Sequence, residues 1–490
     1  MFFSILIFLM IVFGFGYSLM YITKIDCEDS FVYWIVICGL GLAVFGVLST
    51  FMSMFYIPLH YSIFVALSLI IPLWSYLSEN FPKKPVFGMH EKLVVVLFVL
   101  VFGMMLQGSF AYPYLEDDDP WGHAEAAKYI SVTHIASEPA GVDYHYIDPY
   151  PPAYDILMGV LHQTNNSISW TLKFFNSLLV GLTILFFYAL MVGFIKDKNI
   201  ALFSTFILAM TQSFMSHFIW SQTYLIPIII IAFYCLERMT NDWEWMLPTI
   251  VSIAAIFLIQ PSGAVVFVLM FIVYWLVKVG SNGFKSSLDL LFSLFMGGLL
   301  AGMYWFVMLM VYGFKGLLNG IGFYTNMVSG IGVDTSQGIV YSFKDFVLPP
   351  VLSRMDQAIG LGPVLFVLLI ASIIYCIYKW DKRAEMFKIA LLWLIITFLG
   401  IQGNALPWKL MPHRFWVFFA IPVAMISSEI IKFIYMVKKD SIRVISIIII
   451  VAAVFMSSGI PKYLMQTSDW RQGSSPRPCK GKWRKRNERN

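Results

Sequence analysis

The chain consists of long apolar stretches separated by short polar connections. A bilayer core of about 30 Å takes roughly 20 apolar residues in a helix, and such stretches recur along most of the chain. The pattern predicts an all-α polytopic membrane protein with about 12–14 transmembrane helices. Around Gln260-Pro261 the pattern fits either a hairpin or one re-entrant unit. The predicted spans lie near 1–22, 32–48, 51–77, 93–110, 168–194, 199–218, 222–237, 247–260, 263–278, 287–312, 361–379, 387–403, 412–435 and 442–460.

Composition places the chain in the same class. Hydrophobic residues make up 59% and charged residues 12%, whereas soluble domains have about 45–50% and about 25%. The sequence has no Walker loop, no HExxH and no glycine-rich dinucleotide fingerprint, and the predicted outer loops contain no cysteine pair. Nucleotide-driven transport therefore has no support, and we expect no nucleic-acid partner.

Lysine and arginine gather in alternate connections between the predicted spans. The positive-inside rule then places the connection that contains Asp117 on the extracytoplasmic face. The same assignment puts the long connections 111–167 and 313–360 outside, together with 403–411. We expect a multi-pass protein of the cell membrane whose site is formed by these external loops.

An acidic run follows the predicted span that ends near Phe110. It reads Glu116-Asp117-Asp118-Asp119-Pro120-Trp121-Gly122-His123, and Asp148-Pro149-Tyr150-Pro151-Pro152 comes shortly after it. Ionised groups beside hydrocarbon need a cation or hydrogen-bond partners, so the run favours a metal-dependent site. Asp119-Pro120 predicts a helix start with Asp119 as the cap. The alternative is that Asp119 serves only as a cap and the other groups are solvated loop charges.

These motifs resemble the first external loop of the GT-C membrane glycosyltransferases. The chain is most similar to archaeal relatives of the oligosaccharyltransferase catalytic subunit, and more loosely similar to protein mannosyltransferases. The resemblance implies a GT-C-like fold, an archaeal or other prokaryotic origin, and a dolichyl or other polyprenyl phosphate as the sugar carrier. It also implies that Asp117 and Asp119 are catalytic or metal-binding.

A second match lies at Pro412-His413-Arg414-Phe415-Trp416, which is similar to a late span of that family whose arginine contacts the lipid phosphate. An arginine at the end of an apolar helix also suits a phosphate on chemical grounds, since guanidinium forms bidentate charged bonds. The alternative role of Arg414 is an interfacial anchor.

The chain departs from the family at the second external acidic motif. His217-Phe218-Ile219-Trp220-Ser221-Gln222-Thr223 stands there and contains no carboxylate. His217 is a candidate replacement ligand or an interfacial packing residue. The predicted metal ligands are thus Asp117, Asp119, His123 and His217, and largely oxygen ligands favour Mg or Mn.

Candidate sugar contacts come from aromatic and polar residues of the external segments. They are Trp121, Tyr150, Trp220, Gln222 and Asp334. The connection 313–360, which contains Asp334, is rich in glycine and is either a segment that closes over substrate or an ordinary linker. The aromatic residues are alternatively part of the interfacial belt.

The resemblance covers roughly residues 93–473 and divides the chain. We expect extra transmembrane helices in 1–92, a GT-C-like core in 93–460 and a short basic external tail in 461–490, which is disordered or truncated.

The predicted function is transfer of a sugar or oligosaccharide from a polyprenyl-phosphate donor to an external protein, lipid or glycan acceptor. The alternatives are a non-catalytic membrane assembly protein derived from a transferase, and a polytopic transporter. A transporter would show ionisable residues at mid-membrane and broken helices in repeated halves.

Overall fold

The computed structural model describes residues 1–27, 29–79, 84–137, 146–320, 340–349, 358–378, 385–405 and 412–467. Every regular element in these ranges is a helix. The first part of the chain forms α1 (Phe2–Ile22), α2 (Ser30–Met54), α3 (Tyr61–Leu77), α4 (Met89–Ala111), α5 (Asp118–Thr133) and α6 (Ala153–His162). The central part forms α7 (Ile168–Ile195), α8 (Lys198–Met210), α9 (Gln222–Met239), α10 (Met246–Ile259), α11 (Pro261–Asn282) and α12 (Leu288–Gly320). The last part forms α14 (Phe343–Val347), α15 (Pro363–Tyr378), α16 (Glu385–Ile401), α17 (Pro412–Ser427), α18 (Ile430–Tyr435), α19 (Asp440–Val454) and α20 (Ile460–Thr467).

Nine helices of the described part are long and apolar enough to cross a membrane. Four further apolar helices have 10–17 residues. The prediction of an all-α polytopic membrane protein is therefore confirmed. The GT-C-like arrangement and the larger number of spans stay predictions.

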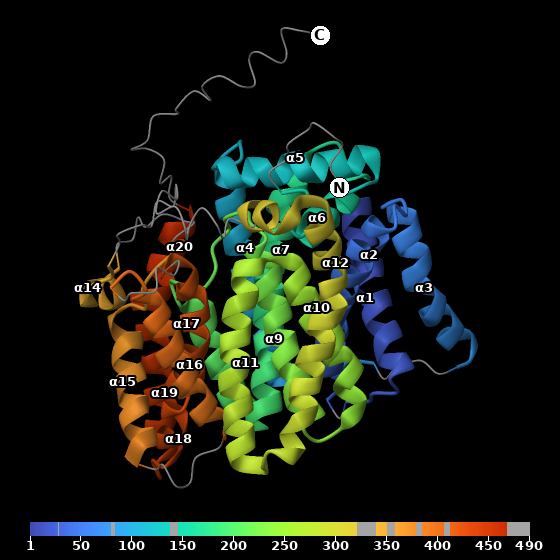
Figure 1. Ribbon diagram of the computed structural model, residues 1–490. Coiled ribbons are helices and arrows are strands. Elements are labelled where there is room, and N and C mark those ends of the chain that lie inside the picture. Colours follow the sequence, from blue (N-terminus) through green and yellow to red (C-terminus); the bar gives the residue numbers. More distant parts are fainter. Residues whose placement is uncertain are drawn as a thin grey trace.

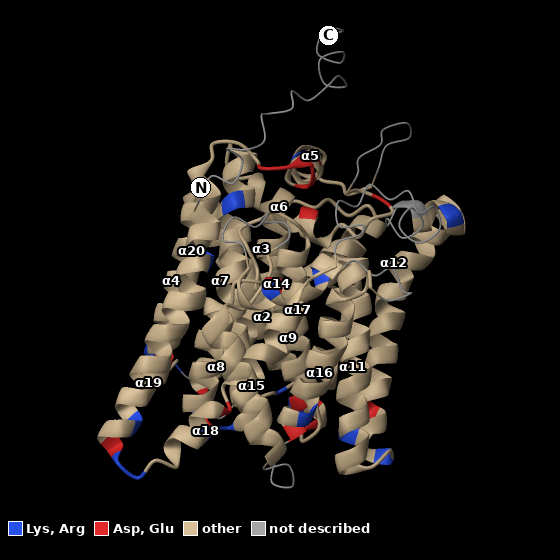
Figure 2. Ribbon diagram, turned by 90° about the vertical axis from the view of Figure 1, so that its left-hand side faces the viewer, with Lys and Arg blue, Asp and Glu red and all other residues tan. Residues whose placement is uncertain are grey.

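The long helices stand side by side, with α5 lying across one end of the bundle (Figure 1). We call this the α5 end. The described parts of the predicted external connections lie toward it, namely α5, α6 and α14. Charged residues are concentrated toward the two ends of the bundle, as an apolar membrane core requires (Figure 2).

The N-terminal helices pack closely on one another and on the central helices. A Cβ atom at Gly16 would collide with the carbonyl of Ile37, and one at Gly41 would collide with the carbonyl of Val12. Glycines thus let α1 and α2 approach backbone to backbone, which is common between membrane helices. The Tyr224 hydroxyl of α9 donates to the Leu42 carbonyl of α2 at 2.5 Å.

The predicted span 199–218 is wrong in its second half, because α8 ends at Met210. The following segment 211–221 is irregular yet buried inside the protein, where its polar groups find partners. The buried Lys462 donates from Nζ to the carbonyls of Ala209 at 3.1 Å and Phe214 at 2.7 Å. Lys462 therefore supplies hydrogen-bond donors to backbone carbonyls at the C-terminal end of α8 and just beyond it.

The predicted span 51–77 also begins too early, since α3 starts at Tyr61. At the other ambiguous position, α10 ends at Ile259 and α11 begins at Pro261. Gln260 is the only residue between these two helices, so two separate helices meet here, and the hairpin and the re-entrant unit both stay predictions. Proline is well suited to the first turn of α11, where a backbone N–H has no helical partner.

Candidate functional site

The acidic run forms the start of α5 at the α5 end. Asp117 is the N-cap, and its Oδ1 accepts from the Asp118 backbone N–H at 2.9 Å. The predicted cap at Asp119 is therefore wrong. Pro120 still lies in the first turn, where its missing N–H costs no helical bond.

Asp119 is exposed, and its side chain has a different role. Its Oδ1 accepts a hydrogen bond of 2.5 Å from the hydroxyl of Tyr146, which is 8% exposed. Tyr146 in turn stacks on the His123 ring with 3.9 Å between ring centroids and 13° between planes. Asp119 is thus connected to His123 through one aromatic ring.

His123 is buried and forms a pair with Asp155. The distance from His123 Nδ1 to Asp155 Oδ1 is 2.9 Å, and neither side chain is more than 2% exposed. Tyr154 contacts the imidazole edge to face at 4.9 Å. Burial raises the pKa of Asp155 above its ordinary value, and the neighbouring His123 opposes this rise.

Sequence reasoning missed Asp155. It lies in the first turn of α6, within the otherwise apolar run Tyr154-Asp155-Ile156-Leu157. A lone carboxylate in an apolar helix was the available signal, because such a group requires a buried partner.

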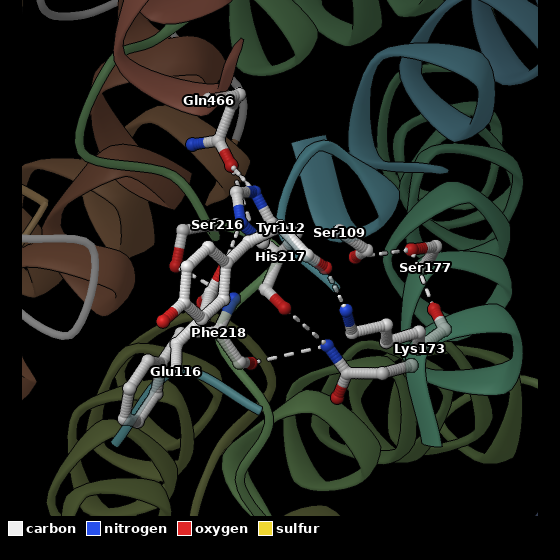
Figure 3. A network of polar contacts seen from close by, with 10 residues as sticks. Ser109, Tyr112, Glu116, Lys173, Ser177, Ser216, His217, Phe218 and Gln466 are labelled. Carbon is white, nitrogen blue, oxygen red and sulfur yellow. Dashed lines mark hydrogen bonds and ion pairs between the residues drawn. The ribbon is translucent and has the colours of Figure 1, made fainter. Parts of the chain in front are cut away.

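His217 lies in a second pair, between three distant parts of the chain (Figure 3). Its Nε2 is 2.8 Å from Glu116 Oε1. Its Nδ1 and its backbone N–H both reach Oε1 of Gln466, at 2.8 and 2.9 Å. Since that amide oxygen only accepts, Nδ1 carries a proton and Nε2 is the atom that meets the carboxyl group.

The surroundings hold His217 closely. Asn176 Nδ2 donates to the carbonyls of His217 at 3.1 Å and Phe218 at 3.0 Å. A Cβ atom at Gly108 would lie 2.6 Å from His217 Nδ1. Sequence reasoning missed Gln466 and the role of Glu116, because both partners lie far from His217 in sequence.

The predicted metal ligands are distributed over different contacts. Asp117 caps a helix, Asp119 meets Tyr146, His123 meets Asp155, and His217 uses both ring nitrogens. Within the described residues, no three His, Cys, Asp or Glu side chains gather in a group that could hold a metal ion. A Mg or Mn site stays a prediction, and in this arrangement it would draw on Asp117 and Asp119.

The charges of Arg414 and of the acidic loop both influence the hydroxyl group of Tyr150. The Tyr150 hydroxyl lies 2.9 Å from Ser221 Oγ, and the Tyr304 hydroxyl donates to the Tyr150 carbonyl at 3.0 Å. Burial raises the pKa of Tyr150 to about 12; Ser221 and the positive charge of Arg414 lower it, and Asp155 and Asp119 raise it. The cationic motif and the acidic motif are therefore within electrostatic reach of one side chain.

Arg414 is partly exposed at the first turn of α17, and its Nη1 donates to the Ser262 hydroxyl of α11. Its Nε is buried and has no hydrogen-bond partner among the described residues. The guanidinium therefore retains donors that could bind an oxyanion.

The remaining predicted sugar contacts lie in different settings. Trp121 is 49% exposed on the outer side of α5. Trp220 contacts Phe218 edge to face at 5.6 Å. Gln222 is 1% exposed at the start of α9. Asp334 and most of the basic tail lie outside the described residues.

Comparison with known proteins gives no further assignment. No protein-family model matches the chain, and no curated protein matches it either.

Proposed function

We propose that this protein is a membrane glycosyltransferase that moves a sugar from a polyprenyl-phosphate donor to an extracytoplasmic acceptor. The supporting observation is that Tyr150 connects the acidic loop with Arg414: Tyr146, which donates to Asp119, packs edge to face on Tyr150 at 5.1 Å, and the charge of Arg414 lowers the pKa of Tyr150. A transferase acting on such a donor needs a cationic group for the phosphate and an acidic group for the acceptor, close to one another.

Arg414 would bind the phosphate of the donor. Its position at the start of α17 lets a lipid carrier lie along the helices while its phosphate stays at the α5 end. A planar guanidinium matches two phosphate oxygens, whereas an ammonium group offers only a point charge.

Asp117 and Asp119 would act on the acceptor side. The acceptor oxygen forms a bond to the anomeric carbon, the bond from that carbon to the phosphate oxygen breaks, and the acceptor proton passes to a carboxylate. The stereochemistry implied is inversion. A divalent cation held by these carboxylates would neutralise charge on the departing phosphate.

The test is sugar transfer in detergent from a polyprenyl phosphate that carries a labelled hexose, with peptide, lipid and glycan acceptors. Transfer should fall when a chelator is added and return with Mg or Mn. Absence of transfer to every acceptor, together with absence of donor binding, would overturn the proposal. A non-catalytic assembly protein would bind partners without transferring label.

A further inference from the structure

Several side chains at the α5 end have buried polar atoms without partners among the described residues, and three of these side chains are those of Gln222, Gln260 and Arg414. Both the oxygen and the nitrogen of the Gln222 amide lack a hydrogen bond among the described residues, as does Oε1 of Gln260. Nε of Arg414 is also buried and lacks a hydrogen-bond partner among the described residues. Gln222 is 1% and Gln260 3% exposed. Leaving a buried polar group unpaired is unfavourable, so these three groups require an explanation.

Successive contacts place these groups around one region. Gln222 follows Ser221, whose hydroxyl lies 2.9 Å from the Tyr150 hydroxyl. Leu225, one helical turn beyond Gln222, touches the position where a Cβ of Gly263 would lie. That same position is 3.1 Å from Gln260 Oε1. Gln260 Oε1 therefore lies at the contact between α9 and α11, and Gln222 lies on the same side of α9 as Leu225, because residues three apart share a helix face.

Arg414 interacts with groups near both ends of this series of contacts. Ser262, two residues after Gln260, accepts from Arg414 Nη1, and Arg414 acts electrostatically on Tyr150. Gln260 is thus two residues from the serine that contacts the proposed phosphate-binding arginine, and Gln222 is next to the serine that contacts Tyr150. On the opposite face of α9, the hydroxyl of Tyr224 is bonded to α2.

Amide side chains indicate the chemistry of a ligand. A glutamine offers two donors and an acceptor without net charge, which complements hydroxyl groups that both donate and accept. A charged sugar would instead leave its charge without a counterion beside Gln222 and Gln260. Arg414 is the cation near these residues, and the phosphate of the donor would already neutralise its charge.

We propose that Gln222 and Gln260 form a subsite that recognises the hydroxyl groups of a neutral hexose on the lipid-linked donor. This inference rests on the proposed function and adds the class of sugar to it. The partly exposed Tyr150 and Arg414 stand at its edge.

The test compares binding of two probes to purified protein in detergent: a polyprenyl phosphate, and the same lipid phosphate carrying a neutral hexose. The wild type should prefer the hexose-bearing lipid. Gln222→Leu should reduce that preference about tenfold and leave binding of the sugar-free lipid unchanged. Its thermal stability should stay equal or rise, because the substitution removes unpaired polar atoms. Arg414→Ala should weaken the binding of both probes.

Tyr188→Phe is the matched control. The Tyr188 hydroxyl is also buried without a partner among the described residues, but it packs in α7 against Phe31, away from this series of contacts. Its removal should leave the preference for the hexose unchanged. If Gln222→Leu does not fold, the same binding measurement is made on Gln260→Leu, which should also lose preference for the hexose-bearing lipid.

The outcomes separate the two proposals. If the wild type binds neither lipid, the proposed function fails. If it binds both and Gln222→Leu keeps the full preference for the hexose, the subsite alone is overturned. The subsite is also overturned if Gln222→Leu and Tyr188→Phe behave alike.

Discussion

Both ends of the bundle contain paired buried groups, but of different kinds: lysine–carboxylate bridges between helices lie at the end away from α5, whereas His–carboxyl pairs and unpaired amides lie at the α5 end. At the end away from α5, Lys278 reaches Glu237 at 3.0 Å and Glu385 at 2.7 Å, which connects α11, α9 and α16. Lys198 reaches Asp29 and Glu91, each at 2.6 Å. At the α5 end, by contrast, Asp155 Oδ2 is buried without a partner, as are the amide atoms of Gln222.

This difference separates the stabilising end from the candidate functional end. Bridged charges join helices and hold them in register, whereas unpaired buried groups cost stability and persist where a protein uses them. Substitutions at the α5 end should therefore change activity more than stability. Substitutions at the other end should do the reverse.

The largest expected effect is at the acidic loop. Asp119→Asn removes the charge that a cation or acceptor proton requires, so transfer should fall about a thousandfold, or about 4 kcal/mol. Asp117→Asn should act similarly. Asn caps nearly as well as Asp at position 117, and an amide oxygen at position 119 can still accept from Tyr146, so folding should survive in both variants. The measurement is transfer from the lipid-linked sugar, with a chelator and then with Mg or Mn.

Asp118→Asn is the control for this loop, because Asp118 is exposed and neighbours both residues. It should retain activity. Full activity of the Asp117→Asn, Asp119→Asn double variant in the presence of chelator would remove the acidic loop from the site.

The next largest effect is at the opposite end, in Lys278→Met. Loss of the cation removes the ion-pair partner that Glu237 and Glu385 share, and we expect about 3 kcal/mol of destabilisation. Unfolding in detergent measures it. Lys285→Met, at an exposed lysine of the same end, should change little. If Lys278→Met kept the wild-type stability but lost sugar transfer, the end away from α5 would be the functional one.

A smaller effect concerns the donor. Arg414→Ala should raise the KM for the lipid-linked donor about thirtyfold, or about 2 kcal/mol, with normal stability. Arg414→Lys should recover only part of the affinity, because it lacks the bidentate geometry. Arg443→Ala is the control, since Arg443 forms an exposed pair with Asp440 in α19. Equal donor affinity in all three variants would exclude Arg414.

The smallest effect is a pH dependence at Asp29. Burial raises the pKa of this carboxyl, but Lys198 and the backbone N–H groups of Phe31 and Val32 outweigh it and hold the pKa below its ordinary 3.8. A depressed pKa adds stability above pH 3.8 that is lost as the pH falls through the folded-state value. Asp29→Asn should thus cost under about 1 kcal/mol at pH 7. Its unfolding midpoint should depend less on pH below 4 than that of the wild type. Identical acid curves for the two proteins would show that the ion pair adds nothing.

Apolar length predicted the helices well because a membrane span depends on local composition. The predicted span 93–110 corresponds to α4 at Met89–Ala111, and 168–194 corresponds to α7 at Ile168–Ile195. The same reasoning failed for residues 211–218, where apolar residues alternate with Ser213, Ser216 and His217. The partners of the His217 side chain, Glu116 and Gln466, come from distant segments, so local hydropathy could not show that the helix ends.

The candidate site was predictable only in part. The sequence indicated the acidic loop and Arg414, since each combines a chemical group with a span end. It could not show that Asp155 pairs with His123 or that Glu116 pairs with His217, because both contacts depend on tertiary packing. The Gln222–Gln260 subsite depends on how α9 meets α11, which no spacing in the sequence specifies.

The bond between His217 and Gln466 has a consequence for biosynthesis. The two residues are 249 positions apart, and Glu116 precedes His217 by another 101. A ribosome releases these segments in that order, so Glu116 and His217 enter the membrane long before their last partner exists. Until α20 is inserted, the imidazole lacks the acceptor that fixes its protonated nitrogen. The contacts around His217 are therefore completed only after α20 has been made.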